Sequence, residues 1–207
     1  MAAEAQSWAT FVHNHAGAVL ACHFFIVVTA TFQWLYVFVL LDIGTRRVVH
    51  WNLTVHPRSE WTIQQFRNGL PVDGTHRFLV HDRDGIFAPA VDEALRSMSL
   101  QVLKTPVRAP QANAHCERFI GTARRECLDW MIPLSEAHLR SILREWTTHY
   151  NRGRPHSALG PGVPDPPQRV AAVQKCKSGI DWPRVRSCSR NRCWEACITS
   201  TLLGPRP

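Results

Sequence analysis

Two carboxylates are spaced so that they could share a metal ion. Asp82 follows a short apolar run at 77–80, and Glu117 lies in the first turn of a long helical pattern. Ligand-binding groups of α/β sheets gather at the carboxyl ends of strands, and hard cations such as Mg²⁺ prefer carboxylate oxygens. This favours metal-assisted chemistry. The alternative is that Asp82 caps a turn and Glu117 pairs with an arginine of a solvated helix (Arg118, Arg124 or Arg125).

The apolar and turn-forming residues predict the elements that position these carboxylates. Their order is βββαβαβαα, which indicates an α/β domain with a mixed sheet, antiparallel first and parallel later. The predicted strands are 19–29, 35–41, 47–53, 77–80 and 100–103. The predicted helices are 59–70, which Ser59 would cap, 89–98, 114–128 and 135–150.

The composition excludes a disordered chain and favours a polyanionic partner. Of 207 residues, 45% are hydrophobic and 19% charged, which supports a buried core. The 24 Lys and Arg exceed the 16 Asp and Glu, and the net charge of +8 favours nucleic acid. Cys22, Cys116 and Cys127 lie in apolar or helical patterns, as expected of reduced thiols in a cytoplasmic protein.

Residues 17–41 contain no Asp, Glu, Lys or Arg, so this stretch is long and apolar enough for a transmembrane helix. Its residues are largely β-branched or aromatic, however, and these favour strands. The polar break at 29–33 also predicts a turn. We therefore expect a buried β-hairpin and no membrane association. A single-pass membrane protein is the alternative.

Three ordered motifs carry a family resemblance: HDRDGIF (81–87), TPVRAPQANAHCERFIGTARREC (105–127) and HYNRGRPHSALG (149–160). Together they resemble the integrase-core transposases of bacterial insertion sequences, relatives of retroviral integrase, over residues 20–165. The resemblance implies an RNase H-like fold, with a five-stranded mixed β-sheet flanked by helices. It also implies DNA integration: a DDE-type polynucleotidyl transferase cleaves and joins DNA with two Mg²⁺ or Mn²⁺ ions held by an Asp, Asp, Glu triad, as a homo-oligomer on DNA.

The residues of that triad can be assigned by motif. Asp82 matches the second Asp and Glu117 the Glu, whereas His23, in LACHFFIVVT, occupies the position of the first Asp. A carboxylate there bridges two ions and offsets their mutual repulsion. Neutral imidazole offers one lone pair and prefers softer metals than Mg²⁺. We therefore expect an inactive or severely impaired enzyme.

Basic side chains around Glu117 suggest a phosphate-binding surface. Phosphate contacts of this kind give affinity without sequence choice, and the alternative is an ordinary solvated helix face. The candidates are Lys104, Arg108, Arg118, Arg124 and Arg125. The motif at 149–160 is expected to close the domain without a chemical role.

The composition divides the chain into three parts. Residues 1–16 are expected to be a truncated N-terminal segment, and 17–165 the catalytic core. Residues 166–207 are expected to be a Pro-rich linker and a poorly ordered tail. Read in another frame, the codons of CWEACITST (193–201) can spell the LGGLHHEY ending associated with this family, which indicates a frameshift. A zinc site is the alternative for the tail cysteines (Cys176, Cys188, Cys193, Cys197).

Three functions follow in order of preference. The first is a degenerate integrase core for DNA integration, in which Asp82 and Glu117 are the remaining metal ligands. The second is a DNA-binding remnant that keeps the basic surface without catalysis. The third is the single-pass membrane protein.

Overall fold

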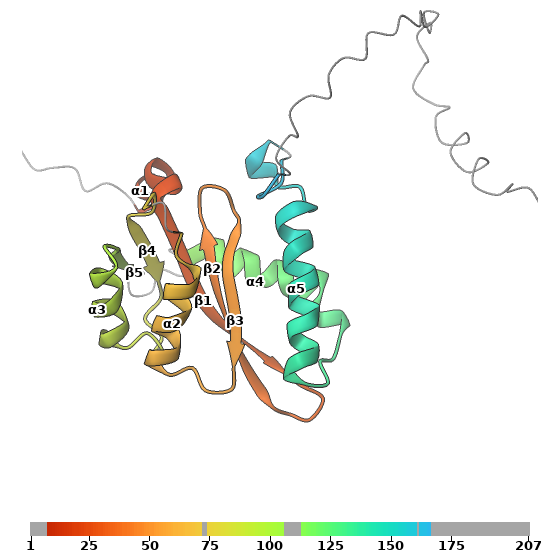
Figure 1. Cartoon of the computed structure of the whole chain (residues 1–207). Coiled ribbons are helices and arrows are strands. Elements are labelled where there is room, and N and C mark those ends of the chain that lie inside the picture. The colour runs from red at the N-terminus through yellow and green to blue at the C-terminus, as the bar shows by residue number, and fades with distance from the viewer. Residues whose placement is uncertain (1–7, 72–73, 106–112, 161, 167–207) are drawn as a thin grey trace, which may run out of the picture. The chain divides into compact units, whose positions relative to one another are not determined.

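The computed structural model describes residues 8–71, 74–105, 113–160 and 162–166. Within these ranges the chain forms five strands and five α-helices (Figure 1). The strands are β1 (Val19–Val28), β2 (Trp34–Asp42), β3 (Val48–Thr54), β4 (Phe78–His81) and β5 (Gln101–Lys104). The helices are α1 (Trp8–His15), α2 (Ser59–Gly69), α3 (Pro89–Ser97), α4 (Ala114–Glu126) and α5 (Glu136–Arg152).

The strands form one mixed sheet in the order β3-β2-β1-β4-β5. β1 is antiparallel to β2 and β2 to β3, whereas β4 is parallel to both β1 and β5. This confirms the predicted mixed sheet. The apolar runs at the predicted positions form its strands, and the predicted amphipathic segments form helices.

Helices cover both faces of this sheet. Alternate residues of a strand point to opposite faces, and β1 divides its side chains between two cores accordingly. Val19, Ala21 and Phe25 pack with residues of α4 and α5, whereas Leu20, Cys22 and Phe24 pack with residues of α2 and α3. In Figure 1, α2 and α3 lie to the left of β3 and α5 lies to its right, while α4 runs behind the strands toward α5.

The uncharged stretch at 17–41 forms the β1–β2 hairpin. The backbone N–H of Thr29 donates to the carbonyl of Gln33 at 3.0 Å, and Phe32 adopts a left-handed conformation (φ 59°) in the turn. The membrane alternative for this stretch is wrong, because its apolar side chains are buried in the core of the sheet. Among the described residues, no helix is long and apolar enough to cross a membrane.

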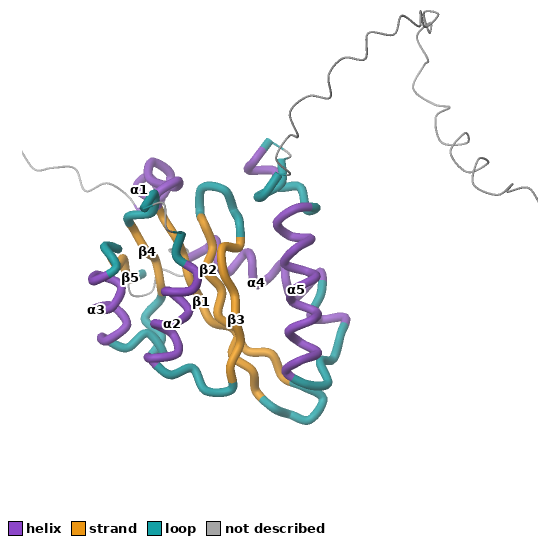
Figure 2. The backbone as a smooth tube through the Cα atoms, in the orientation of Figure 1, coloured by secondary structure: helices purple, strands orange, loops and turns teal. Residues whose placement is uncertain are grey.

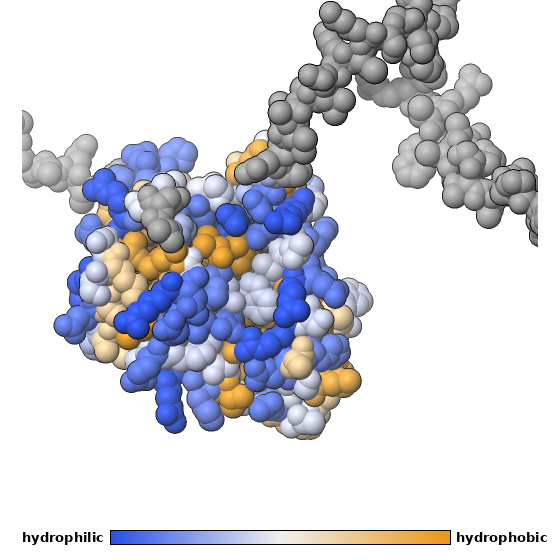
Figure 3. Space-filling model, viewed as in Figure 1, coloured by the Kyte–Doolittle hydropathy of each residue, from blue (hydrophilic) through white to orange (hydrophobic). Residues whose placement is uncertain are grey.

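Apolar side chains also remain exposed at the tip of this hairpin. Figure 2 shows the β1–β2 turn beside the loop that joins α4 to α5, and the N–H of Ala30 donates to the carbonyl of Pro133 at 2.8 Å. Phe32 and Trp34 on the turn and Trp130 and Ile132 on the loop are exposed. Figure 3 shows apolar surface at this end of an otherwise largely hydrophilic face. The candidate DNA-binding residues Arg118, Arg124 and Arg125 are not part of this apolar surface.

Two local features differ from expectation. α1 lies in a segment for which no element is predicted. It forms because Phe11 packs edge-on against Phe78 of β4, with ring centroids 5.2 Å apart, and Val12 is buried. Ser59 was expected to cap α2, but it is the first helical residue. Arg58 is the N-cap and makes no side-chain capping bond.

Asn151 joins α5 to the start of β3. Its Oδ1 accepts the backbone N–H of Val48 at 2.9 Å, and its Nδ2 donates to the carbonyl of the same residue at 3.0 Å. These two hydrogen bonds occupy both the backbone N–H and the carbonyl of Val48, the first residue of the edge strand β3. It supports the expected domain-closing role of the motif at 149–160.

We predict that Asn151→Ala lowers the free energy of unfolding by about 1–3 kcal/mol, because Val48 loses both partners. Urea denaturation at neutral pH measures the change. Asn68→Ala is the control, since the Asn68 side chain bonds only the exposed Gln64 among the described residues, and we expect a change within about 0.5 kcal/mol. Equal effects of the two substitutions would contradict the role of Asn151.

Candidate active site and basic pocket

The strand register places His23 beside Asp82. In the parallel pairing of β1 with β4, Ala21 is opposite Val80. Two residues further along each chain, the same register brings His23 opposite Asp82. Neighbouring strands are about 4.8 Å apart, so side chains at matching positions touch.

The two side chains are in contact. Nδ1 of His23 lies 3.1 Å from Oδ2 of Asp82, an ion-pair distance without the directed geometry of a hydrogen bond. Burial raises the pKa of Asp82, but the contact with His23 and the backbone N–H of Asp84 outweigh it. The pKa of Asp82 therefore lies below its usual value, and the carboxylate is charged at neutral pH.

The second oxygen of Asp82 is also engaged. Its Oδ1 accepts the backbone N–H of Asp84 at 3.2 Å, while the Asp84 carboxylate accepts the N–H of Ile86. Asp82 thus shapes a turn, as one sequence-based alternative held, and also faces His23. Asp42 lies at the β2–β3 turn, where it accepts backbone N–H groups of Gly44 and Thr45. It does not replace the missing carboxylate.

α4 brings Glu117 to the same region. The side chain of Asn113, just before α4, donates to the carbonyl of Cys22 at 3.1 Å and ties the start of the helix to β1. Glu117 and His23 then line one shallow groove of about 530 Å³, together with Arg124. The Glu117 carboxylate is exposed and has no ion-pair partner among the described residues. The alternative interpretation, in which Glu117 pairs with an arginine of its helix, finds no such ion pair in that part of the chain.

These side chains do not fit a two-ion magnesium site. His23 occupies the position that would need a second carboxylate, and both oxygens of Asp82 already have contacts. Cys22 and Cys116 lie nearby. Burial, and to a lesser extent the negative charge of Asp82, raise the pKa of the Cys116 thiol, which therefore stays protonated at neutral pH. The described part of the chain holds no cluster of three or more His, Cys, Asp or Glu arranged for a metal ion.

The basic residues expected on one DNA-binding surface are distributed over several places. Arg124 lies at the groove, where its Nη2 donates to the carbonyl of Ile26 at 3.2 Å. Lys104 instead pairs with Asp92 at 2.6 Å, and the buried His81 contacts the same carboxylate at 3.0 Å. Arg108 lies outside the described residues.

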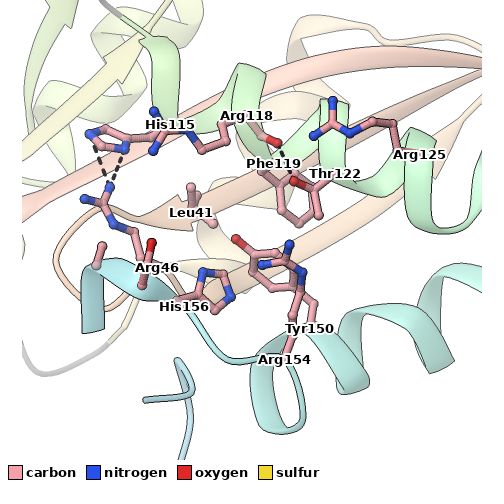
Figure 4. A pocket seen from close by; sticks show the side chains of 12 residues that line it. Leu41, Arg46, His115, Arg118, Phe119, Thr122, Arg125, Tyr150, Arg154 and His156 are labelled. Carbon is pink, nitrogen blue, oxygen red and sulfur yellow. Dashed lines mark hydrogen bonds between the residues drawn. The ribbon is translucent and has the colours of Figure 1, made fainter. Parts of the chain in front are cut away.

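Arg118 and Arg125 belong to a separate basic pocket on the other side of α4, with a volume of about 380 Å³. Figure 4 shows side chains entering it from α4, from the β2–β3 turn and from the end of α5. Its charged and titratable lining consists of Arg46, His115, Arg118, Arg125, Tyr150, Arg154 and His156. Among the residues that the structure describes, no carboxylate lines the pocket.

The cations of the pocket repel one another. Burial, and then the positive charges of Arg46 and Arg118, lower the pKa of His115 to about 4. This imidazole is therefore neutral at pH 7 and can accept a hydrogen bond from Nη1 of Arg46. Burial and Arg118 also lower the pKa of Arg46. Arg154 differs from the others, because it forms a two-pronged pair with Glu126 at 2.7–3.0 Å.

The sequence analysis did not single out Asn113, Arg46 or His115. Asn113 lies one helical turn before Glu117, a spacing that could have suggested that it orients the helix. Arg46 meets His115 across 69 positions of the chain. No local pattern indicates such a contact, because it depends on how α4 packs against the β2–β3 turn.

The sheet order and the flanking helices define a fold class, the RNase H-like fold. Solved structures of this class are similar in fold. A simian T-cell lymphotropic virus intasome chain has a TM-score of 0.58 with 11% identity, covering 84% of this chain and 60% of its own. The Mos1 transposase catalytic domain with raltegravir and Mg has a TM-score of 0.54 with 18% identity, covering 68% and 78%. The magnesium complex of the HTLV-2 integrase catalytic core has a TM-score of 0.53 with 12% identity, covering 72% and 93%.

Proteins that are similar in sequence point to a smaller group within this fold class. The family model described as integrase core domain matches residues 99–164, a segment that includes Glu117. The InsD protein of Escherichia coli K12 insertion element IS2E is 28% identical over 164 residues, covering 75% of this chain and 69% of its own. The E. coli transposase InsD of IS2A/D/F/H/I/K is also 28% identical, covering 75% and 50%. The chain is similar in sequence to the InsD transposases of insertion element IS2, and it spans about half the length of most of the InsD proteins it matches.

The Arg154–Glu126 pair predicts a pH dependence. The bond from Arg154 lowers the pKa of Glu126 against a smaller effect of burial. A carboxyl group with a lowered pKa stabilises the fold above its unfolded pKa of about 4.3, and this contribution is lost as pH falls through the lowered value. Both partners are partly exposed, so the pair contributes about 0.2–1 kcal/mol at pH 7.

We expect Arg154→Met to raise the pKa of Glu126 and to cost this amount at pH 7 but nothing near pH 2. Carboxyl NMR titration and urea denaturation at the two pH values measure the changes. Arg152→Met is the control, because Arg152 pairs with Asp165 instead. An unchanged Glu126 pKa in Arg154→Met would show that the pair has no effect.

Proposed function

We propose that the chain is the DNA-integration core of an insertion-sequence transposase whose catalysis is impaired by His23. The observation that carries the proposal is the 3.1 Å contact between His23 and Asp82 beside the groove that Glu117 lines. In the related cores, a carboxylate in the place of His23 is expected to share divalent ions with the other two. Here the imidazole contacts one oxygen of Asp82, and it cannot bridge two ions.

DNA is the proposed substrate. The net charge of +8, the exposed Glu117 and the arginine at the groove support this choice. The InsD proteins are transposases by name, but the chain spans only about half the length of most of them. Transposition is therefore proposed for this chain by analogy with them. We extend it to a homo-oligomer on DNA and a cytoplasmic location. Residues 17–165 would form the catalytic core.

We predict that His23→Asp restores DNA strand joining. The assay uses pre-branched DNA, which relaxes the need for recognition of the element's ends, with Mg²⁺ or Mn²⁺ in separate reactions. We expect at least about a 100-fold increase over the unaltered chain, the size of effect seen when one electrostatic group of an active site is lost or regained. His23→Gln is the matched control and should stay as inactive as the unaltered chain.

Asp82→Asn and Glu117→Gln, each added to His23→Asp, should abolish the regained activity. Joining by the unaltered chain at the rate of His23→Asp would contradict the impairment. A folded His23→Asp protein that binds DNA but joins none would contradict the assignment of Asp82 and Glu117, and would favour the second candidate, a DNA-binding protein without catalysis. The basic pocket is the observation that keeps this candidate open.

A further inference from the structure

We propose that the basic pocket between α4, the β2–β3 turn and the end of α5 is a phosphate-binding site. Its ligand would be a phosphate group, supplied either by the DNA backbone or by a free phosphate. This site is distinct from the groove of His23 and Glu117. Glu117 and Arg124 share one side of α4, whereas Arg118 and Arg125 lie on another.

The first argument is uncompensated charge. Arg46, Arg118 and Arg125 have no carboxylate within ion-pair distance among the described residues, and only Arg154 is neutralised, by Glu126. Arg46 is half-buried, so its guanidinium carries a desolvation cost that a bound anion offsets, whereas Arg118 and Arg125 are exposed and add positive charge to the pocket lining. Arginine also matches phosphate geometry with two parallel hydrogen bonds.

The second argument is backbone strain at Arg46. This residue has φ 64°, a left-handed conformation that costs a non-glycine residue about 1–2 kcal/mol. In this conformation the Arg46 guanidinium reaches His115 of α4, as Figure 4 shows. Strain of this kind is concentrated at ligand sites, where the surrounding structure maintains it.

The test starts with inorganic phosphate at constant ionic strength, balanced with NaCl, and follows the amide signals of the full chain by NMR. Arg46→Asn removes the charge while keeping a residue that tolerates positive φ, and Arg118→Gln keeps a good helix former. We expect each variant to weaken phosphate binding at least about tenfold, the loss of one charge-assisted hydrogen bond. Arg67→Gln, on the exposed side of α2, is the control and should bind as the unaltered chain does.

The second arm identifies the source of the phosphate group and rests on the proposed function. It measures duplex DNA binding over a range of salt concentrations. If the backbone supplies the group, Arg118→Gln lowers the slope of log K against log salt by about 1, and phosphate competes with DNA. If phosphate binds but neither effect occurs, the ligand is a free phosphate.

Phosphate binding that is absent, or equally strong in folded Arg46→Asn and Arg118→Gln, would overturn the site. Neither result depends on strand joining, so failure of the catalytic proposal leaves this test intact.

Discussion

The parallel register between β1 and β4 is the constraint on which the candidate site depends. It sets Ala21 opposite Val80 and so brings His23 to Asp82 at 3.1 Å. A slip of one residue would turn every side chain of β1 to the other face of the sheet, and both cores would lose their partners. Two carboxylates at this position would repel each other by about 1–4 kcal/mol unless a cation lay between them. An imidazole beside Asp82 carries no such negative charge, so this register is compatible with the fold without a cation between the two side chains.

α4 connects the two candidate sites. Asn113 fastens its first turn to the carbonyl of Cys22, next to His23, and this places Glu117 over the groove. The helix then presents Arg118 and Arg125 to the basic pocket. A single packed helix therefore separates a groove lined by the Glu117 carboxylate from a pocket whose described lining contains no carboxylate. Buried residues of the same helix, Cys116, Phe119 and Ala123, hold it against the sheet.

Most of the fold could be predicted from local patterns, but contacts across the chain could not. Apolar runs and the break at 29–33 predicted the β1–β2 hairpin, and the motif resemblance predicted which residues would meet at the site. α1 was missed because its stability comes from Phe78, far along the sequence. The arginines of α4 were expected on one surface, whereas packing assigns Arg124 to the groove and Arg118 and Arg125 to the pocket. Lys104 pairs with Asp92, a partner on α3 that the composition of its own strand could not reveal.

The most direct test of the central claim is Mn²⁺ binding, followed by the EPR signal of the free ion, in the unaltered chain and in His23→Asp. Mn²⁺ prefers carboxylate oxygens, as Mg²⁺ does. If His23 has replaced an ion-sharing carboxylate beside Asp82, His23→Asp should bind Mn²⁺ at least about tenfold more tightly, a difference of about 1.4 kcal/mol. Adding Asp82→Asn should remove that gain. Equal affinities of the unaltered chain and His23→Asp would contradict the account.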